Sequence, residues 1–170
     1  VSKFDTSQVT DMRMMFYECR IPSLNLSNFN TSNVTSMSGM FWVCINLTQL
    51  DLSNFDTSKV TDMSRMFSDC SSLTSFDLSN FDTSNVTDMS MMFYNCSSLT
   101  SLDLSSFDTS QVTSMKGMFY MIFGYSDLTT LNINNFDTSN VKNMKDMFYG
   151  CSSLITLDVS NFNTSNVTDM

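Results

Sequence analysis

Three aspartates recur at a constant spacing, at Asp51, Asp77 and Asp103. Carboxylate oxygens are the ligands that hard cations prefer, so a row of neighbouring carboxylates could hold Ca²⁺. The alternative is a solvated, acidic surface, because a calcium site normally gathers several more ligands from converging loops. Like charges on adjacent strands repel each other unless they are solvated or neutralised. We expect the acidic surface and keep a calcium row as the alternative.

Hydroxyl side chains flank this acidic row. Ser75 stands two residues before Asp77, and Ser101 stands two residues before Asp103. A regular array of hydroxyl and carboxylate groups could bind a glycan or, as a further alternative, ice. Small hydroxylated residues also simply suit the crowded concave side of a curved sheet. Ser75, Ser101, Asp77 and Asp103 are therefore candidate partner-binding residues.

An aromatic residue recurs at another position of the pattern. The members of this aromatic row are Tyr17, Trp42, Tyr94, Tyr120 and Tyr149, with Ser68 in the same place. Tyr and Trp dominate binding hot spots, so the row could contact a partner. It could also cover the surface, with rings packed flat and polar tips in water. The aromatic candidates for partner binding are Trp42, Tyr120, Phe123 and Tyr125.

Five cysteines could form disulfides or bind a metal. They occupy one repeated position, at Cys19, Cys44, Cys70, Cys96 and Cys151. Stacked copies of one position lie about 5 Å apart with parallel side chains. A disulfide needs Cβ atoms about 3.8 Å apart on converging vectors. We therefore expect a row of reduced, buried thiols.

The sequence lacks the usual constellations of catalysis. It contains no His, no Gly-rich phosphate loop and no Cys/His spacing typical of a metal site. Its aspartates recur unit by unit, instead of forming one pair whose pKa values could be separated. We expect no enzymatic activity and no cofactor.

A repeated block of 26 residues positions all of these side chains, and its clearest copies are residues 50–75 and 76–101. One Phe begins each unit, at Phe4, Phe29, Phe55, Phe81, Phe107 and Phe136, with a partial unit from Phe162. An internal period of this length is typical of a solenoid. We predict a single repeat array over residues 1–170. Because neither end carries a polar capping unit, we expect the sequence to be a piece of a longer protein.

Two apolar patterns recur within each unit. The first has the form L-x-x-L-x-L, as at Leu99, Leu102 and Leu104, and predicts a short strand whose copies pair in parallel. The second has the offsets of a helical stripe, and in one unit its members are Val60, Met63, Met66, Phe67 and Cys70. The predicted fold class is therefore α/β. We expect a leucine-rich-repeat-like solenoid with one short parallel strand and one short helical turn per 26-residue repeat.

A polar Asp-Thr-Ser segment follows each Phe, as at Asp56 to Ser58. Asp accepts hydrogen bonds from backbone amides nearby, so the segment predicts an Asx-turn. Asn30 and Asn163 replace the Asp in two units. Because Asn keeps the acceptor but loses the charge, this exchange favours a structural role over a metal site.

Two units depart from the pattern: the first is one residue short around Cys19 to Pro22, and the fifth carries an insertion. The fifth unit is three residues longer than the others between Phe119 and Asp127, and Ile122 stands where the Cys is expected. Insertions in solenoids lie in loops, which are often on a binding face. We expect a surface bulge that contains Tyr120, Phe123 and Tyr125.

Two features taken together carry a family resemblance. They are the C-x-x-L-x-x-L-x-L run and the M-F pair that ends three residues before the Cys. Essentially the whole chain resembles the leucine-rich repeats of BspA-type bacterial surface proteins. It is similar to the 26-residue form found in mycoplasma surface lipoproteins. The resemblance implies a binding or adhesive role at the cell surface and brings no catalytic residues.

Charge and hydropathy limit the partners. The formal net charge of −9 opposes binding to nucleic acid through this segment. No run approaches the roughly 20 apolar residues that span a bilayer, so we expect no membrane insertion here. The predicted function is non-enzymatic: adhesion or binding to a host protein or glycan on the extracellular surface of a bacterium, with any signal or anchor outside the segment. The alternative is a structural spacer or stalk that self-associates end to end, stabilised or not by calcium.

Overall fold

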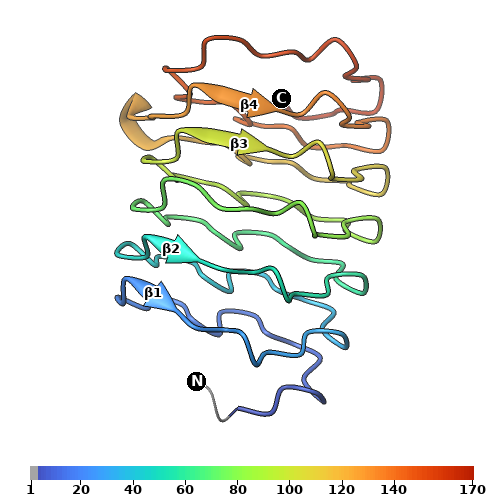
Figure 1. The fold of residues 1–170 in the computed structure, drawn as a ribbon. Coiled ribbons are helices and arrows are strands. Elements are labelled where there is room, and N and C mark those ends of the chain that lie inside the picture. The colour runs from blue at the N-terminus through green and yellow to red at the C-terminus, as the bar shows by residue number, and fades with distance from the viewer. Residues whose placement is uncertain (1–3) are drawn as a thin grey trace.

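The structure is a computed structural model that describes residues 4–170, with the side chain of Phe123 outside the described part. The chain winds into similar coils that are stacked in chain order (Figure 1). Each coil corresponds to one sequence unit, so equivalent side chains of successive units lie beside one another. This arrangement confirms the predicted repeat solenoid.

Short parallel strands occupy one limb of the coils. Strand β1 (Ser23–Leu24) pairs with β2 (Gln49–Leu50), and β3 (Ser101–Asp103) pairs with β4 (Thr130–Asn132). These strands share one side of the stack in Figure 1. The L-x-x-L-x-L pattern forms them because Leu24 and Leu102 point inward while their neighbours face solvent. The equivalent stretches around Ser75 and Thr156 are not regular strands.

A second ladder of parallel bridges runs the length of the stack. The bridged residues, in order, are Asp11, Ser36, Asp62, Asp88, Ser114, Asn143 and Asp169. In each unit, the bridged residue follows the recurring Asp-Thr-Ser or Asn-Thr-Ser turn and directly precedes the first Met. The coils are therefore tied together on two sides, by the strands and by this ladder.

The predicted helical turn is not confirmed, because the stretch from Met63 to Cys70 consists of tandem turns. Within it, the Met66 amide donates to the Met63 carbonyl at 3.2 Å, a three-residue span. Alternate amides leave the coil and donate to the next unit: Arg65 to Ser90, Phe67 to Met92 and Asp69 to Tyr94, at 2.7 to 3.0 Å. An α-helix keeps such bonds within itself. Positive φ angles of 55° at Arg65 and 58° at Asp69 turn the chain so that it can bond outward.

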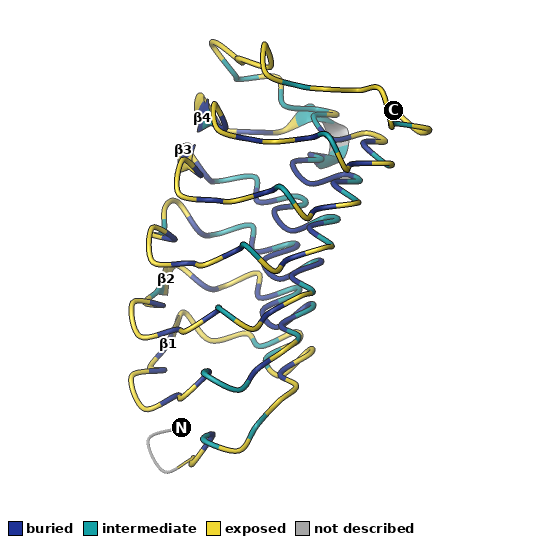
Figure 2. Cartoon of the chain, turned by 90° about the vertical axis from the view of Figure 1, so that its right-hand side faces the viewer, coloured by how far each residue is buried: buried dark blue, intermediate teal, exposed yellow. Residues whose placement is uncertain are grey.

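The interior is a set of apolar columns that pass through all coils. Phe41, Phe67, Phe93 and Phe119 are fully buried, and their ring centroids lie 5.7 to 5.8 Å apart in a stack. Figure 2 shows buried segments alternating with exposed corners along the inner coils, whereas the last coil is exposed or intermediate throughout. Each buried Phe contributes about 1.5–3 kcal/mol relative to an exposed one. The fold is therefore held by contacts between units.

The two end coils leave part of these columns uncovered in the 170-residue chain. Phe4 and Met15 are 56% and 39% exposed at the first coil, and Val159 and Met170 are 40% and 74% exposed at the last. An apolar cavity of about 620 Å³ opens on the last coils beside Met147 and the chain end. Both end faces are therefore apolar.

Candidate functional site

The aspartates of the strand limb cap their own turns. Each carboxylate accepts a hydrogen bond from the backbone amide of the Ser two residues later: Asp51 from Ser53, Asp77 from Ser79 and Asp103 from Ser105, at 2.9 to 3.0 Å. These amide bonds lower the pKa of each of the three carboxyls. The carboxylates are exposed to solvent. They form an acidic row whose geometry each turn fixes separately.

The candidate residues of the strand limb come together in one shallow place. Ser75, Asp77, Ser101 and Asp103 line a hollow of about 280 Å³ between neighbouring coils. A second hollow of about 220 Å³ lies one coil earlier, between Asp51 and Asp77. In residues 4–170, no three or more His, Cys, Asp or Glu side chains gather as they would around a metal ion. The row therefore presents hydroxyl and carboxylate groups side by side, without a metal cage.

The Asp-Thr-Ser segments form the predicted Asx-turns. Ser amides donate to the Asp carboxylates of these segments at 2.9 to 3.0 Å: Ser58 to Asp56, Ser84 to Asp82, Ser110 to Asp108 and Ser139 to Asp137. The next turn of the unit has the same kind of bond, from Ser64 to Asp62 and from Ser90 to Asp88, at 2.8 to 2.9 Å. Asn30 and Asn163 accept the same bond at 3.0 Å. The acceptor oxygen is therefore what these positions require, and the charge is not.

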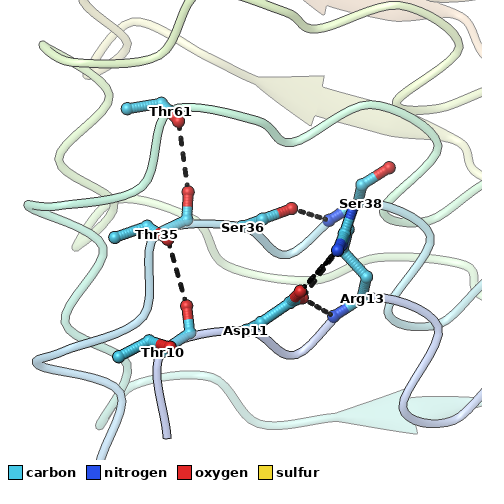
Figure 3. Close-up of polar contacts among 7 residues, drawn as sticks. All are labelled: Thr10, Asp11, Arg13, Thr35, Ser36, Ser38 and Thr61. Carbon is cyan, nitrogen blue, oxygen red and sulfur yellow. Dashed lines mark hydrogen bonds and ion pairs between the residues drawn. The ribbon is translucent and has the colours of Figure 1, made fainter.

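Threonine hydroxyls link the coils, which the sequence did not predict. Buried Thr31 donates to the Asp56 carbonyl at 2.9 Å and accepts from the Asp56 amide at 2.8 Å. An exposed row of threonines also links the coils along the bridge ladder, where the Thr35 hydroxyl donates to the Thr10 carbonyl and the Thr61 hydroxyl donates to the Thr35 carbonyl (Figure 3). The available signal was the recurrence of Thr at the same two positions of the unit.

An ion pair marks the first coil of the bridge ladder. Arg13 contacts Asp11 at 2.7 Å, and both side chains are exposed (Figure 3). Exposed pairs of this kind contribute about 0–1 kcal/mol. It is a local surface contact.

The cysteines are free thiols, of which Cys44, Cys70 and Cys96 are buried and the two end members, Cys19 and Cys151, are partly buried. The Cys70 thiol donates to the Phe41 carbonyl at 3.2 Å, and the Cys96 thiol donates to the Phe67 carbonyl at 3.1 Å. Burial raises the pKa of Cys96 to about 12 and that of Cys44 to about 11. Thiols held protonated in this way are poor nucleophiles.

The aromatic row packs ring against ring. Tyr120 lies 5.0 Å from Tyr94 and 4.6 Å from Tyr149 between centroids, with planes 9° and 11° apart. Stacking covers the ring faces and leaves edges and hydroxyls outward. Tyr120 is therefore half-buried within a stack, so the row offers a partner an edge and not a flat platform.

Trp42 is held by neighbouring side chains. Its ring lies 5.0 Å from Tyr17, its indole N–H donates to the Asp69 carboxylate at 3.3 Å, and the Arg65 guanidinium lies 5.8 Å from the ring. Asn95 donates to the other oxygen of Asp69 at 2.8 Å. These contacts give Trp42 a structural role in the aromatic row.

The inserted segment forms a small projection with a polar hollow behind it. A 3-10 helix, η1 (Ile122–Gly124), follows buried Met121, and Tyr125 is then 74% exposed. A hollow of about 370 Å³ separates this segment from the adjoining coils. Its lining comprises Ser97, Ser98, Gly124, Tyr125, Ser126, Asp127, Ser152 and Ser153. The sequence predicted the insertion and Tyr125 but not the contribution of Ser97, Ser98, Ser152 and Ser153, which belong to other units. The Phe123 side chain lies outside the described residues.

Comparison with known proteins places the chain in a family. The family model described as "Mycoplasma protein of unknown function, DUF285" matches residues 1–76, 75–132 and 120–170, so the chain belongs to this family. A search of curated proteins finds no match. Among solved structures, the crystal structure of a leucine-rich repeat protein from T. pallidum aligns at 20% identity with a TM-score of 0.43. That alignment covers 91% of this chain and 75% of the other.

No described segment resembles a membrane span. Within residues 4–170, no helix has the length and apolar character needed to cross a bilayer.

Proposed function

We propose that this chain is a non-enzymatic repeat module of a bacterial cell surface, where it binds a host protein or glycan. The hollow lined by Ser75, Asp77, Ser101 and Asp103 carries the proposal, because it exposes polar groups from neighbouring coils side by side. The turn hydrogen bonds already fix the carboxylates, so these side chains lose little further conformational entropy when a partner binds. The match to a Mycoplasma family supports a bacterial origin.

The chemistry of the side chains supports binding over catalysis. The Asp51, Asp77 and Asp103 carboxylates are each engaged by a turn amide, which keeps them ionised. The buried thiols of Cys44 and Cys96 are kept protonated. A partner of the acidic row is expected to be cationic, metal-bridged or a neutral glycan.

Adhesion of the 170-residue chain tests this proposal. Beads coated with the chain are expected to bind epithelial cells or immobilised extracellular-matrix protein saturably, and free chain is expected to compete. The control is a set of beads coated with chain that has been unfolded in urea and then blocked. Binding that does not saturate, or that the unfolded control matches, contradicts a specific adhesive role.

The end faces support a second candidate, a spacer that associates end to end. Exposed Phe4 and Val159 belong to columns that elsewhere pair unit on unit, so one end is chemically matched to the other. Light scattering over a range of concentrations is expected to show a rising mass if chains stack. A constant monomer mass opposes the spacer. A melting temperature that does not rise in millimolar Ca²⁺ opposes calcium stabilisation of the array.

A further inference from the structure

The insertion is built into the fold. The Met121 amide donates to the Tyr149 carbonyl at 2.8 Å, and the Asp127 amide donates to the Ser97 carbonyl at 2.9 Å. The Ser152 hydroxyl donates to the Gly124 carbonyl at 2.6 Å. The inserted segment is therefore tied to the coil before it and to the coil after it, and the hollow between them is preformed.

A glycine in the following coil makes room for the insertion. A Cβ atom on Gly150 would lie 2.3 Å from the Met121 carbonyl oxygen. At the equivalent position, other units carry side chains: Glu18, Val43, Asp69 and Asn95. The glycine therefore occurs in the unit that packs on the longer loop. Because glycine has no Cβ, the backbone at Gly150 can lie close to the backbone of the loop.

The aromatic residue at the hollow is more exposed than those of the stacked aromatic row. Tyr125 is 74% exposed and lines the hollow, whereas Tyr120 is stacked between two rings. Asp127 supplies an exposed carboxylate on the same wall. The hydroxyls of Ser152 and Ser153 donate to the carbonyls of Gly124 and Ser126, so their oxygens can still accept hydrogen bonds.

This combination matches a neutral sugar. A pyranose has one face of C–H groups, which can pack on an aromatic ring, and a rim of hydroxyls, which donate to carboxylate and hydroxyl oxygens. The volume of about 370 Å³ lies in the range of small-ligand sites. Asp127 and the net charge of −9 repel sialylated or sulfated sugars.

We infer that the hollow beside Tyr125 binds a neutral glycan, with the Tyr125 ring against the sugar face and the Asp127 carboxylate accepting its hydroxyls. The inference rests on the proposed binding function and adds to it a second site with a stated ligand class. The strand-limb hollow of Ser75 to Asp103 remains the surface that carries the proposed function, and the hollow beside Tyr125 is a separate pocket for the sugar.

An oligosaccharide array tests the site. The probes are neutral oligosaccharides ending in glucose, galactose, mannose or N-acetylhexosamine, each beside its sialylated counterpart. We expect the chain to retain a subset of the neutral probes and to bind the sialylated forms at least about tenfold more weakly. Tyr125→Ala and Asp127→Asn are each expected to weaken binding about tenfold, as loss of a ring contact or a charge-assisted hydrogen bond implies.

Matched variants separate the site from general surface effects. Tyr17→Ala and Asp5→Asn remove a half-exposed ring and an exposed carboxylate on the first coil, away from the insertion, and both should bind within twofold of the unmodified chain. Circular dichroism checks that all four variants remain folded. Binding that Tyr125→Ala leaves unchanged, equal retention of sialylated probes, or no retained neutral probe overturns the inference. If cell adhesion persists in those cases the proposed function stands alone, and if adhesion is also absent both are wrong.

Discussion

Replacing Gly150 by Ala tests how the fold accommodates the inserted segment. Gly150 has φ of +75°, and an added Cβ would lie 2.3 Å from the Met121 carbonyl oxygen and 3.3 Å from the Gly124 Cα. Real Cβ atoms do not approach backbone oxygen so closely, so the inserted segment must shift. Gly117 is the matched control. It has φ of +57°, but its added Cβ would meet only the flexible Met91 side chain at 3.5 Å and the Tyr120 Cβ at 3.6 Å.

The two substitutions separate backbone strain from steric overlap. A left-handed conformation costs an L-residue about 1–2 kcal/mol relative to Gly, and both variants bear that cost. Overlap with packed backbone adds about 1–3 kcal/mol to Gly150→Ala alone. We therefore expect Gly117→Ala to lower the free energy of unfolding by about 1–2 kcal/mol and Gly150→Ala by about 2–5 kcal/mol.

Urea unfolding followed by circular dichroism measures the difference between the two variants. Hydrogen exchange of the Asp127 amide, which is bonded to Ser97, reports whether the loss is located at the insertion. Because repeat arrays can unfold in parts, hydrogen exchange at this one amide locates the effect more specifically than urea unfolding of the whole chain. Equal destabilisation by the two substitutions, with unchanged protection at Asp127, would refute the account of a loop accommodated by Gly150.

Three further predictions concern the scaffold. Asp56→Asn should leave stability nearly unchanged because Asn30 already accepts the same amide bond, whereas Asp56→Ala should cost about 1 kcal/mol in urea unfolding; equal losses would contradict the turn assignment. Phe67→Ala should cost about 3–5 kcal/mol, since the ring is fully buried in the stack, and a loss below 1 kcal/mol in the same assay would argue against that packing. Burial raises the pKa of Cys96 to about 12 from 9.0, so the folded state favours the protonated thiol; its stabilisation is complete below pH 9 and is lost as pH rises from 9 towards 12. Melting temperatures should therefore fall above pH 9, less so in Cys96→Ala, and an identical fall in that variant would contradict the assignment.

The apolar columns were predictable because the repeat itself displays them. Leu102 and Phe67 each belong to a position that recurs as an apolar residue, and both are buried. The Asx-turns were predictable for a related reason, since Asp and Asn exchange at the same position while the acceptor oxygen is kept. Local chemistry and repetition together determine these features.

The limb predicted as helical shows where periodicity is ambiguous. Tandem turns closed by bonds across three residues put Met66 and Phe67 inside with the same offsets as a helix, so the apolar pattern alone does not distinguish turns from a helix. A signal was present in the glycines: Gly39 and Gly117 share one position of the unit, and Gly150 occupies another, and both positions have positive φ. Glycine recurring inside an apparent helix favours turns over a helix.

The hollow at the insertion was only partly predictable. The extra length marked a loop, and Tyr125 was named from its residue type. The contributions of Ser97 and Ser152 depend on which coils lie against the insertion, which the stacking of the units determines. The sequence also could not show that Tyr120 is stacked and Tyr125 is exposed, because both are aromatic residues in the same segment.

A titration followed by two-dimensional NMR tests the central claim most directly. The isotope-labelled chain is mixed with a neutral oligosaccharide selected on the array, and amide shifts are mapped on the coils. Shift changes are predicted to gather at residues 97–98, 124–127 and 152–153, and to disappear in Tyr125→Ala. Changes that follow the Ser75 to Asp103 row instead, or that persist unaltered in Tyr125→Ala, would contradict the account.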